Sequence, residues 1–146
     1  MSVISPQSHP TYSVTKSIEF CYGHRLLDHD GPCRHLHGHN GLVEVEVRAA
    51  SLDERAMVCD FAEIKRIVKG WLDRELDHRM ILRRDDPLVA PLQAAGEPLY
   101  LVEDNPTAEC IARHIFEHAS AAGLPVARVT MWETPTSSAT YSCPSP

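Results

Sequence analysis

A strict two-residue period just after Gly41 restricts the fold of this chain more than any other feature of its sequence. Valine alternates with charged residues along LVEVEVRA, residues 42–49. Successive side chains of a β-strand point to opposite faces, so this segment is predicted to be a strand with one dry face and one wet face. The valines then need cover from other elements of the chain.

A second strand is predicted upstream, over residues 12–20. Its apolar residues share a parity within YSVTKSIEF, as expected of a half-buried strand. If this strand continues, Tyr22 and His24 lie on its inward face. Residues 26–41 between the two strands are rich in Gly, Pro, Asp and His, which predicts a loop whose last part extends into the second strand.

Two amphipathic helices are predicted in the second half of the chain. Asp60 is an expected N-cap for a helix that continues to residue 76, with apolar residues at three- and four-residue steps. Asn105 and Pro106 form a cap-and-first-turn pair for a second helix, which Gly123 terminates. The second helix is expected to bury Ile111, Ile115, Phe116 and Ala119.

A further strand is predicted after Pro125, in VARVTMWE. Ala127, Val129 and Met131 share one face, and Glu133 ends that face. An acid on the dry side of a strand is costly unless it has a partner, so Glu133 calls for an explanation. A last short strand is expected over 139–141 and a long irregular loop over 83–104. This order of elements predicts an α+β fold, a four-stranded antiparallel sheet with two helices on one face.

Length and charge narrow the class of protein. The chain has 146 residues, and single domains commonly hold about 100–150, so we predict one domain over 1–146 with flexible ends at 1–10 and 142–146. The 14 basic and 20 acidic residues give a net charge of −6 without a concentrated basic stretch, which disfavours nucleic-acid binding. No apolar run approaches the roughly 20 residues of a membrane span, and no signal sequence is recognisable, which indicates a cytoplasmic protein without a membrane partner.

Histidine is the residue type that first suggests chemistry. The chain contains nine histidines, and four of them fall within residues 29–39. His37 and His39 form His-x-His, and in an extended segment residues two apart point the same way, so both imidazoles can reach one ion. His24, on the inward face of the neighbouring strand, would supply a third nitrogen. Zinc with three protein nitrogens and an open fourth position is typical of a catalytic site.

The same loop leaves several roles open. Cys33 is a candidate base or nucleophile, because a nearby dication and imidazoles favour the thiolate, but it is equally a candidate fourth zinc ligand in a closed structural site. His35 shares the parity of His37. Gly38, however, lets the backbone fold closely around an ion, and nothing comparable precedes His35. We therefore interpret His35 and His29 as surface groups or as groups that contact the ligands.

Further candidates stand near the predicted helix ends. Asp77 can orient the imidazole of His78 for proton transfer only if the preceding helix ends near Leu76, because adjacent side chains on a helix do not face one another. Without that condition the pair is an ordinary helix terminus. Thr107 and Glu109 lie in the first turn of the second helix, where taken alone they indicate capping and favourable interaction with the helix dipole.

Six sequence blocks follow one another in a recognisable order. They are FCYGHRL (20–26), CRHLHGHN (33–40), VCDFAEI (58–64), LDH (76–78), NPTAE (105–109) and WET (132–134). Together they resemble the 6-pyruvoyltetrahydropterin synthase / 6-carboxytetrahydropterin synthase family from residue 12 to about 141. The chain departs from the family pattern at Pro32, where a basic residue is often found, at Cys110, where Asn is common, and in a longer segment over 83–104.

The resemblance implies the tunnelling fold, in which the antiparallel sheets of several subunits join into a barrel. It implies a homo-oligomer, a hexamer or another trimer-based assembly, with active sites between subunits. It also implies a Zn²⁺ ion held by His24, His37 and His39. The implied substrate is a small pterin triphosphate.

The resemblance further assigns roles around that metal. Cys33 would be the proton acceptor, with Asp77 and His78 as its relay. Glu133 would anchor the pterin ring through its guanidine-like edge, which would explain an acid at the end of a dry strand. The resemblance also places Thr107 and Glu109 near the pterin pocket.

The spacing after the cysteine separates the activities within the family. Three residues stand between Cys33 and His37, as in carboxy-forming members, whereas pyruvoyl-forming members typically have five, and a third subgroup has Glu in place of the cysteine. The chain is thus similar to 6-carboxytetrahydropterin synthases, which convert 7,8-dihydroneopterin triphosphate to 6-carboxytetrahydropterin with release of acetaldehyde and triphosphate, towards queuosine and related deazapurines. Two alternatives stay open: a 6-pyruvoyltetrahydropterin synthase, which eliminates triphosphate, and a non-catalytic zinc- or pterin-binding module.

A triphosphate also requires local positive charge on a protein of net charge −6. Arg25, Arg34 and Lys16 are near enough in sequence to the histidines to be candidates. A neighbouring subunit is another source of such groups.

Overall fold

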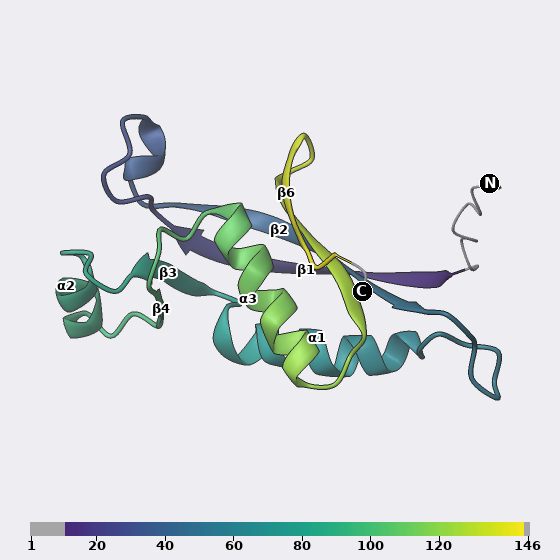
Figure 1. Ribbon diagram of the computed structural model, residues 1–146. Coiled ribbons are helices and arrows are strands. Elements are labelled where there is room, and N and C mark those ends of the chain that lie inside the picture. The colour runs from purple at the N-terminus through teal and green to yellow at the C-terminus, as the bar shows by residue number, and fades with distance from the viewer. Residues whose placement is uncertain (1–10, 145–146) are drawn as a thin grey trace, which may run out of the picture.

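The computed structural model describes residues 11–144, which form a curled mixed sheet with two helices across one face (Figure 1). The elements are β1 (Tyr12–His24), η1 (Pro32–Arg34), β2 (His37–Ala49), α1 (Phe61–Glu75), β3 (Arg79–Arg83), α2 (Val89–Ala94), β4 (Leu99–Val102), α3 (Ala108–Ala121), β5 (Val126–Thr134) and β6 (Ser137–Ser142). The predicted α+β class is confirmed. Within residues 11–144 none of the helices has the length and apolarity of a membrane span.

The two longest strands form the centre of the sheet. β1 and β2 each contain 13 residues and pair antiparallel along their whole length, from Tyr12 opposite Ala49 to His24 opposite His37. The first strand therefore continues to His24, which is the condition for Tyr22 and His24 to lie on its inward face. The predicted extension of the loop into the second strand is confirmed, since β2 already begins at His37.

The prediction of a four-stranded antiparallel sheet is wrong. The sheet has six strands in the order β4-β3-β1-β2-β5-β6, and β3 pairs parallel with β1 and with β4. The segment predicted as an irregular loop, 83–104, contains α2 and β4. Ile81 and Leu82 are both buried, so β3 is covered on both faces and lacks the alternation that reveals a half-exposed strand.

The helix starts show one confirmed cap and one correction. The Asp60 carboxylate accepts a hydrogen bond from the Ala62 N–H at 2.8 Å, so Asp60 caps α1 as predicted. The cap of α3 is Thr107 rather than Asn105. The Asn105 side chain is instead used in a long-range contact, because it bonds both the N–H and the carbonyl of Leu27. Gly123, at φ +98°, follows the end of α3 as predicted.

Two irregularities occur in β5, and the first changes which side chain points inward. The register with β2 shifts between Glu46 and Val47, which face Arg128 and Val126. Ala127 is thus the extra residue of a β-bulge. The prediction that Ala127 faces the core is therefore wrong, because Val126 packs there in its place. A second shift lies between Trp132 and Thr134 opposite β6, so the side chain of Glu133 also comes from a bulged position.

Two smaller expectations also need correction. Glu46 belongs to the predicted wet face but is only 5% exposed, because Arg48 and Arg128 form ion pairs with it at 2.8 and 2.5 Å and cover it. The last strand runs over Ser137–Ser142, which is longer at both ends than the predicted 139–141 and reaches the first residue of the expected end segment 142–146. Residues 1–10 and 145–146, also predicted flexible, lie outside the described residues.

The hydrophobic core fills the space between the sheet and the pair α1 and α3. The valines of β2 are fully buried, and α3 buries Ile111, Ile115, Phe116 and Ala119 as predicted. On the core-facing side, Ile18 and Phe20 of β1 and the valines of β2 are apolar up to the pair Phe20 and Gly41, which face each other. Beyond that pair the same face carries polar rings, and these form the site described next.

Candidate metal centre

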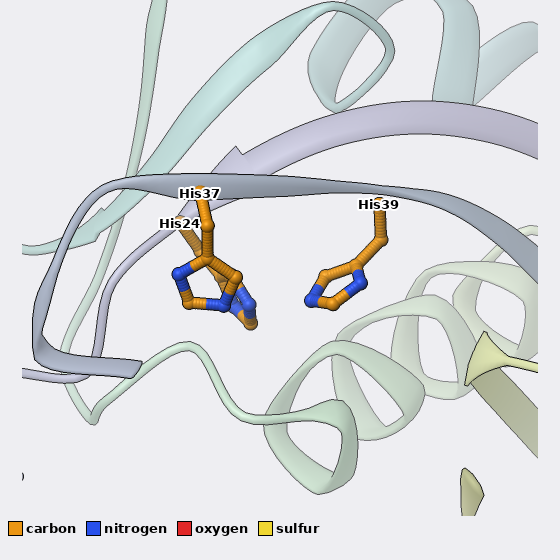
Figure 2. A group of neighbouring side chains, drawn as sticks. All are labelled: His24, His37 and His39. Carbon is orange, nitrogen blue, oxygen red and sulfur yellow. The ribbon is translucent and has the colours of Figure 1, made fainter. Parts of the chain in front are cut away.

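Three imidazoles converge at the end of the core (Figure 2). His24 ends β1 and lies opposite His37, while His39 follows two residues along β2, so all three side chains point to the core-facing side. Their ring centroids lie 4.5 to 5.1 Å apart. One nitrogen from each ring lies within 4.8 Å of the others, so the three residues can hold a single metal ion.

Backbone carbonyls orient two of these rings. Nδ1 of His24 donates to the carbonyl of Pro106 at 2.7 Å, and Nδ1 of His37 donates to the carbonyl of His35 at 2.7 Å. Because a carbonyl only accepts, the proton lies on Nδ1 in both rings, and Nε2 keeps its lone pair for a metal. The loop before α3, which contains Pro106, runs beneath the rings in Figure 2.

The unpaired imidazole nitrogens are better explained as metal ligands than as groups buried in a core without a metal. Nε2 of His24 and Nε2 of His39 are buried, and neither has a hydrogen-bond partner among residues 11–144. An unsatisfied buried polar group costs about 1–3 kcal/mol, so such positions are rare unless a ligand completes them. Three imidazole nitrogens suit zinc and related first-row ions.

The electrostatic surroundings keep His24 in its ligand form. Burial lowers the pKa of His24 to about 4, since the Pro106 hydrogen bond only partly offsets it and His37 and His39 lower it further. The imidazole is therefore neutral at pH 7, and only neutral imidazole binds a metal.

This pKa predicts how the metal-free protein responds to acid. The folded pKa of His24 lies below its unfolded value near 6.5, so its contribution to stability is complete above pH 6.5 and is lost as the pH falls towards 4. We expect His24 to lower the free energy of unfolding by roughly 3 kcal/mol between pH 7 and pH 4. Urea unfolding of chelator-treated protein and of its His24→Gln variant measures this difference. Equal pH dependence in both proteins would contradict it.

Glu133 lies beside the histidines and explains the acid on a dry strand. Its Oε1 is 3.9 Å from Nε2 of His24. Glu133 shares the parity of Met131, which is buried in the core, whereas the Trp132 indole between them donates to Glu44 on the opposite face at 2.7 Å. One carboxylate therefore stands at the edge of the metal centre, with 27% of its side chain exposed.

Cys33 lies in the short helix η1, in the loop that joins β1 to β2. Its side chain is half-buried, and its carbonyl accepts a hydrogen bond from the Leu26 N–H at 2.9 Å. Among the described residues the ligand group contains the three imidazoles alone, so the structure does not bring this thiol into it. The conformation thus gives no support to a four-ligand structural site.

Asp77 and His78 can pair because the helix before them ends near Leu76, as the sequence analysis required. α1 ends at Glu75 with Leu76 as its C-cap, and Nδ1 of His78 lies 2.8 Å from Oδ2 of Asp77. His78 has φ +57°, a left-handed conformation that turns the chain sharply after the helix. The pair is therefore formed in this chain.

The Asp77–His78 pair lies away from the imidazoles. Asp77 accepts from the Cys21 N–H at 2.9 Å and lines a hollow with Glu19, Cys21 and Asn40. Cys21 and Asn40 face each other between the Tyr22–His39 and Phe20–Gly41 pairs, so their side chains point to the opposite face of the sheet. Burial raises the pKa of Asp77, but the hydrogen bonds from Cys21 and His78 outweigh it and hold the pKa below its usual value.

Thr107 and Glu109 surround a different hollow. Thr107 caps α3 by accepting from the Cys110 N–H at 3.2 Å, and Glu109 is exposed in the first turn. Both line a shallow hollow with Arg113 and Tyr141. Thr107 follows Pro106 directly, so the start of α3 touches the metal centre through its backbone rather than through these side chains.

The three basic candidates have different surroundings. The guanidinium of Arg25 donates two hydrogen bonds to the buried carboxylate of Asp86, so its charge is already paired. Lys16 lies eight residues before His24, roughly 26 Å away along an extended strand. Arg34 is exposed, has no carboxylate partner in the described part of the chain, and directs Nε to the His35 ring at 3.3 Å. Arg34 is thus the candidate left free near the site.

Sequence reasoning identified the three imidazoles and Glu133 but missed groups around them. The carbonyls of Pro106 and His35 that orient the rings belong to the backbone, so the residue types at these positions do not reveal them. For Tyr22 the sequence predicts only an inward-facing side chain, although its parity with His24 places it beside the ligands. Burial, followed by the negative charge of Glu133, raises the pKa of Tyr22, so its hydroxyl stays protonated at neutral pH.

Comparisons with known proteins indicate one family for this chain. The family model described as 6-pyruvoyl tetrahydropterin synthase matches residues 13–144. A 6-carboxy-5,6,7,8-tetrahydropterin synthase of Rickettsia bellii is 41% identical over 103 residues, which cover 69% of this chain and 75% of that protein. One from Haemophilus influenzae is 34% identical over 138 residues, covering 89% and 98%. The solved 6-pyruvoyl tetrahydropterin synthase of Caenorhabditis elegans has a TM-score of 0.70 and 27% identity, covering 92% and 97%.

Proposed function

Because the chain belongs to the 6-pyruvoyl tetrahydropterin synthase family, we propose that it is a zinc-dependent 6-carboxy-5,6,7,8-tetrahydropterin synthase. The proposed substrate is 7,8-dihydroneopterin triphosphate, the proposed co-products are acetaldehyde and triphosphate, and the proposed pathway is cytoplasmic queuosine and deazapurine synthesis. The observation that carries the proposal is the group of three imidazoles, with two unpaired buried nitrogens and Glu133 3.9 Å from one of them. The three-residue spacing from Cys33 to His37 supports the carboxy type.

In the proposed mechanism His24, His37 and His39 hold the metal. Bound zinc supplies a Lewis acid that polarises oxygens of the substrate side chain and acidifies the neighbouring C–H and O–H bonds. Each of the two orienting carbonyls fixes its imidazole before substrate arrives, so little reorganisation is needed on binding.

The remaining residues bind the substrate and move protons. The Glu133 carboxylate accepts hydrogen bonds from the guanidine-like edge of the pterin ring, and Thr107 and Glu109 belong to the surrounding pocket. The thiolate of Cys33 accepts a proton from the substrate side chain. The hydrogen bond from His78 to Asp77 holds the imidazole in one tautomer, which leaves Nε2 free to accept and pass on that proton.

A complete site of this kind requires a second copy of the chain. The Asp77–His78 pair and the three imidazoles lie on opposite faces of one sheet, which supports a site shared between subunits. Tyr12, Leu52, Met57 and Phe61 also form an exposed apolar hollow at the other end of β1, and apolar surface of this kind supports contact between subunits. We therefore propose a homo-oligomer, a hexamer or another trimer-based assembly.

Product analysis tests the proposed activity. Zinc-loaded protein incubated with 7,8-dihydroneopterin triphosphate under reducing conditions is expected to yield 6-carboxytetrahydropterin and acetaldehyde, identified by mass spectrometry. 6-Pyruvoyltetrahydropterin without acetaldehyde would show the pyruvoyl type instead. Unchanged substrate at full zinc content would show a binding module that lacks turnover.

A further inference from the structure

Four side chains, rather than three, form the floor of the metal centre. His24 faces His37 across the paired strands, and Tyr22 faces His39 in the next pair on the same side. Residues two apart on one strand and opposite on the next occupy the corners of a square on one face of a sheet. Three corners carry imidazoles that can bind a metal, and the fourth carries the phenol of Tyr22.

The Tyr22 ring is fixed in this position by its neighbours. Its centroid lies 5.2 Å from the His24 ring, 5.6 Å from the His39 ring and 5.3 Å from the Phe20 ring. Gly41, on β2, leaves room for it, because a Cβ at Gly41 would come within 3.0 Å of Tyr22 Cε1. Tyr22 therefore contacts two of the three metal-binding rings directly.

The hydroxyl of Tyr22 is buried and unpaired among residues 11–144. The residue is 3% exposed, and its hydroxyl oxygen is buried without a hydrogen-bond partner in the part of the chain that the structure describes. An apolar contact with the histidine rings needs only the ring, which phenylalanine would supply. An unpaired buried hydroxyl costs about 1–3 kcal/mol, so its retention beside the ligands points to a partner that arrives with the substrate.

We propose that Tyr22 is a substrate-binding residue whose hydroxyl donates a hydrogen bond to an oxygen of the side chain at C6 of the bound pterin. This inference rests on the proposed function. The ring edge of the pterin already has a proposed acceptor in Glu133, whereas its side-chain oxygens are the groups expected next to the three histidines. Tyr22 packs on His24 and His39, so its hydroxyl lies where the side chain of a bound pterin is expected. The hydroxyl therefore favours pterins whose side chain carries an oxygen that can accept its hydrogen bond.

Two oxidised, unreactive ligands test this assignment through binding alone. Neopterin carries the trihydroxypropyl side chain, and 6-methylpterin has the same ring without side-chain oxygens. For the zinc-loaded protein we expect Tyr22→Phe to weaken neopterin binding about tenfold, since one hydrogen bond to a buried ligand oxygen is lost, and to leave 6-methylpterin binding unchanged. Isothermal titration calorimetry gives both dissociation constants, and zinc analysis establishes equal metal content.

Tyr100→Phe is the matched control. It makes the same chemical change at a ring that contacts Trp71 and His114 on the helical layer, away from the metal centre. We expect it to leave the binding of both ligands unchanged. Tyr22→Phe protein that loses affinity for both ligands equally would place the contact on the pterin ring and overturn the proposal.

A purely structural Tyr22 would give a different pattern. Removal of an unpaired buried hydroxyl would then raise the free energy of unfolding and leave both dissociation constants unchanged, which would also overturn the proposal. Wild-type protein that binds neither pterin at full zinc content would contradict the proposed function itself, and the assignment of Tyr22 with it. That last outcome is a failure of the wild-type protein to bind, whereas the others are differences between Tyr22→Phe and a wild-type protein that binds, so the two failures are distinguishable.

Discussion

Replacement of His39 with alanine is expected to remove zinc from the protein and to abolish turnover. Four-ligand structural zinc sites bind their metal with about 10–16 kcal/mol, so one imidazole contributes roughly 3 kcal/mol, on the order of 100-fold in affinity. His39 is a sharp test because its Nε2 is buried without a partner among residues 11–144. Metal analysis after dialysis against a weak chelator measures zinc per chain, and acetaldehyde release measures turnover.

His35→Ala provides the control for this prediction. His35 stands two residues before β2, but its imidazole is exposed and lies outside the ligand group, and its carbonyl accepts the hydrogen bond from His37 Nδ1. The variant keeps that carbonyl, so we expect it to keep its zinc. A His39→Ala protein that retains one tightly bound zinc per chain, or a His35→Ala protein that loses it, would contradict the proposed ligand set.

Replacement of Cys33 with alanine is expected to stop turnover while zinc stays bound. Proton transfer by a positioned side chain typically contributes about 10²–10⁴-fold to a rate, so the loss of acetaldehyde release should fall in that range. The zinc content should not change, because the ligand group consists of imidazoles. Loss of the metal together with the thiol would instead identify Cys33 as a ligand and contradict its role as a base.

The position of the Asp77–His78 pair permits a stronger form of this test. If one subunit supplies Cys33 and its neighbour supplies His78, Cys33→Ala and His78→Ala proteins are each inactive but complement one another. Random co-assembly of equal amounts would restore about a quarter of the sites, because each site needs an intact residue from both chains. The two proteins are unfolded, mixed and refolded together, and each is refolded alone as the control. No recovery of acetaldehyde release in a zinc-loaded mixed oligomer would contradict a shared site.

Local patterns in the sequence predicted how several side chains of the candidate site are placed. The parity of His24 with the apolar residues before it placed its ring on the dry face, because alternation along a strand depends only on neighbouring residues. The same rule put His37 and His39 on one face and predicted that Glu133 needs a partner. The end of α1 before Asp77 was likewise predicted as the condition for the Asp77–His78 pair. Each of these inferences involves residues within one strand or one helix end.

Other features of the site depend on contacts between distant residues. Pro106 is 82 positions from His24, and the hydrogen bond between them follows from the packing of α3 against the sheet. Asn105 is a residue type that commonly caps helices, but its side chain bonds Leu27, and Thr107 caps α3 instead. The unpaired hydroxyl of Tyr22 became recognisable only from burial, which no local pattern reports.

The sequence by itself determined the α+β class, the dry face of the central strands and the set of imidazoles on it, because period and capping act between near neighbours. Only the tertiary structure decided the parallel strands β3 and β4, the bulge that places Val126 rather than Ala127 against the core, and the separation of the Asp77–His78 pair from the histidines. Strand order, register and burial arise from contacts between segments far apart in the chain. Their energies depend on how those segments pack together, and the order of residues within one segment does not specify that packing.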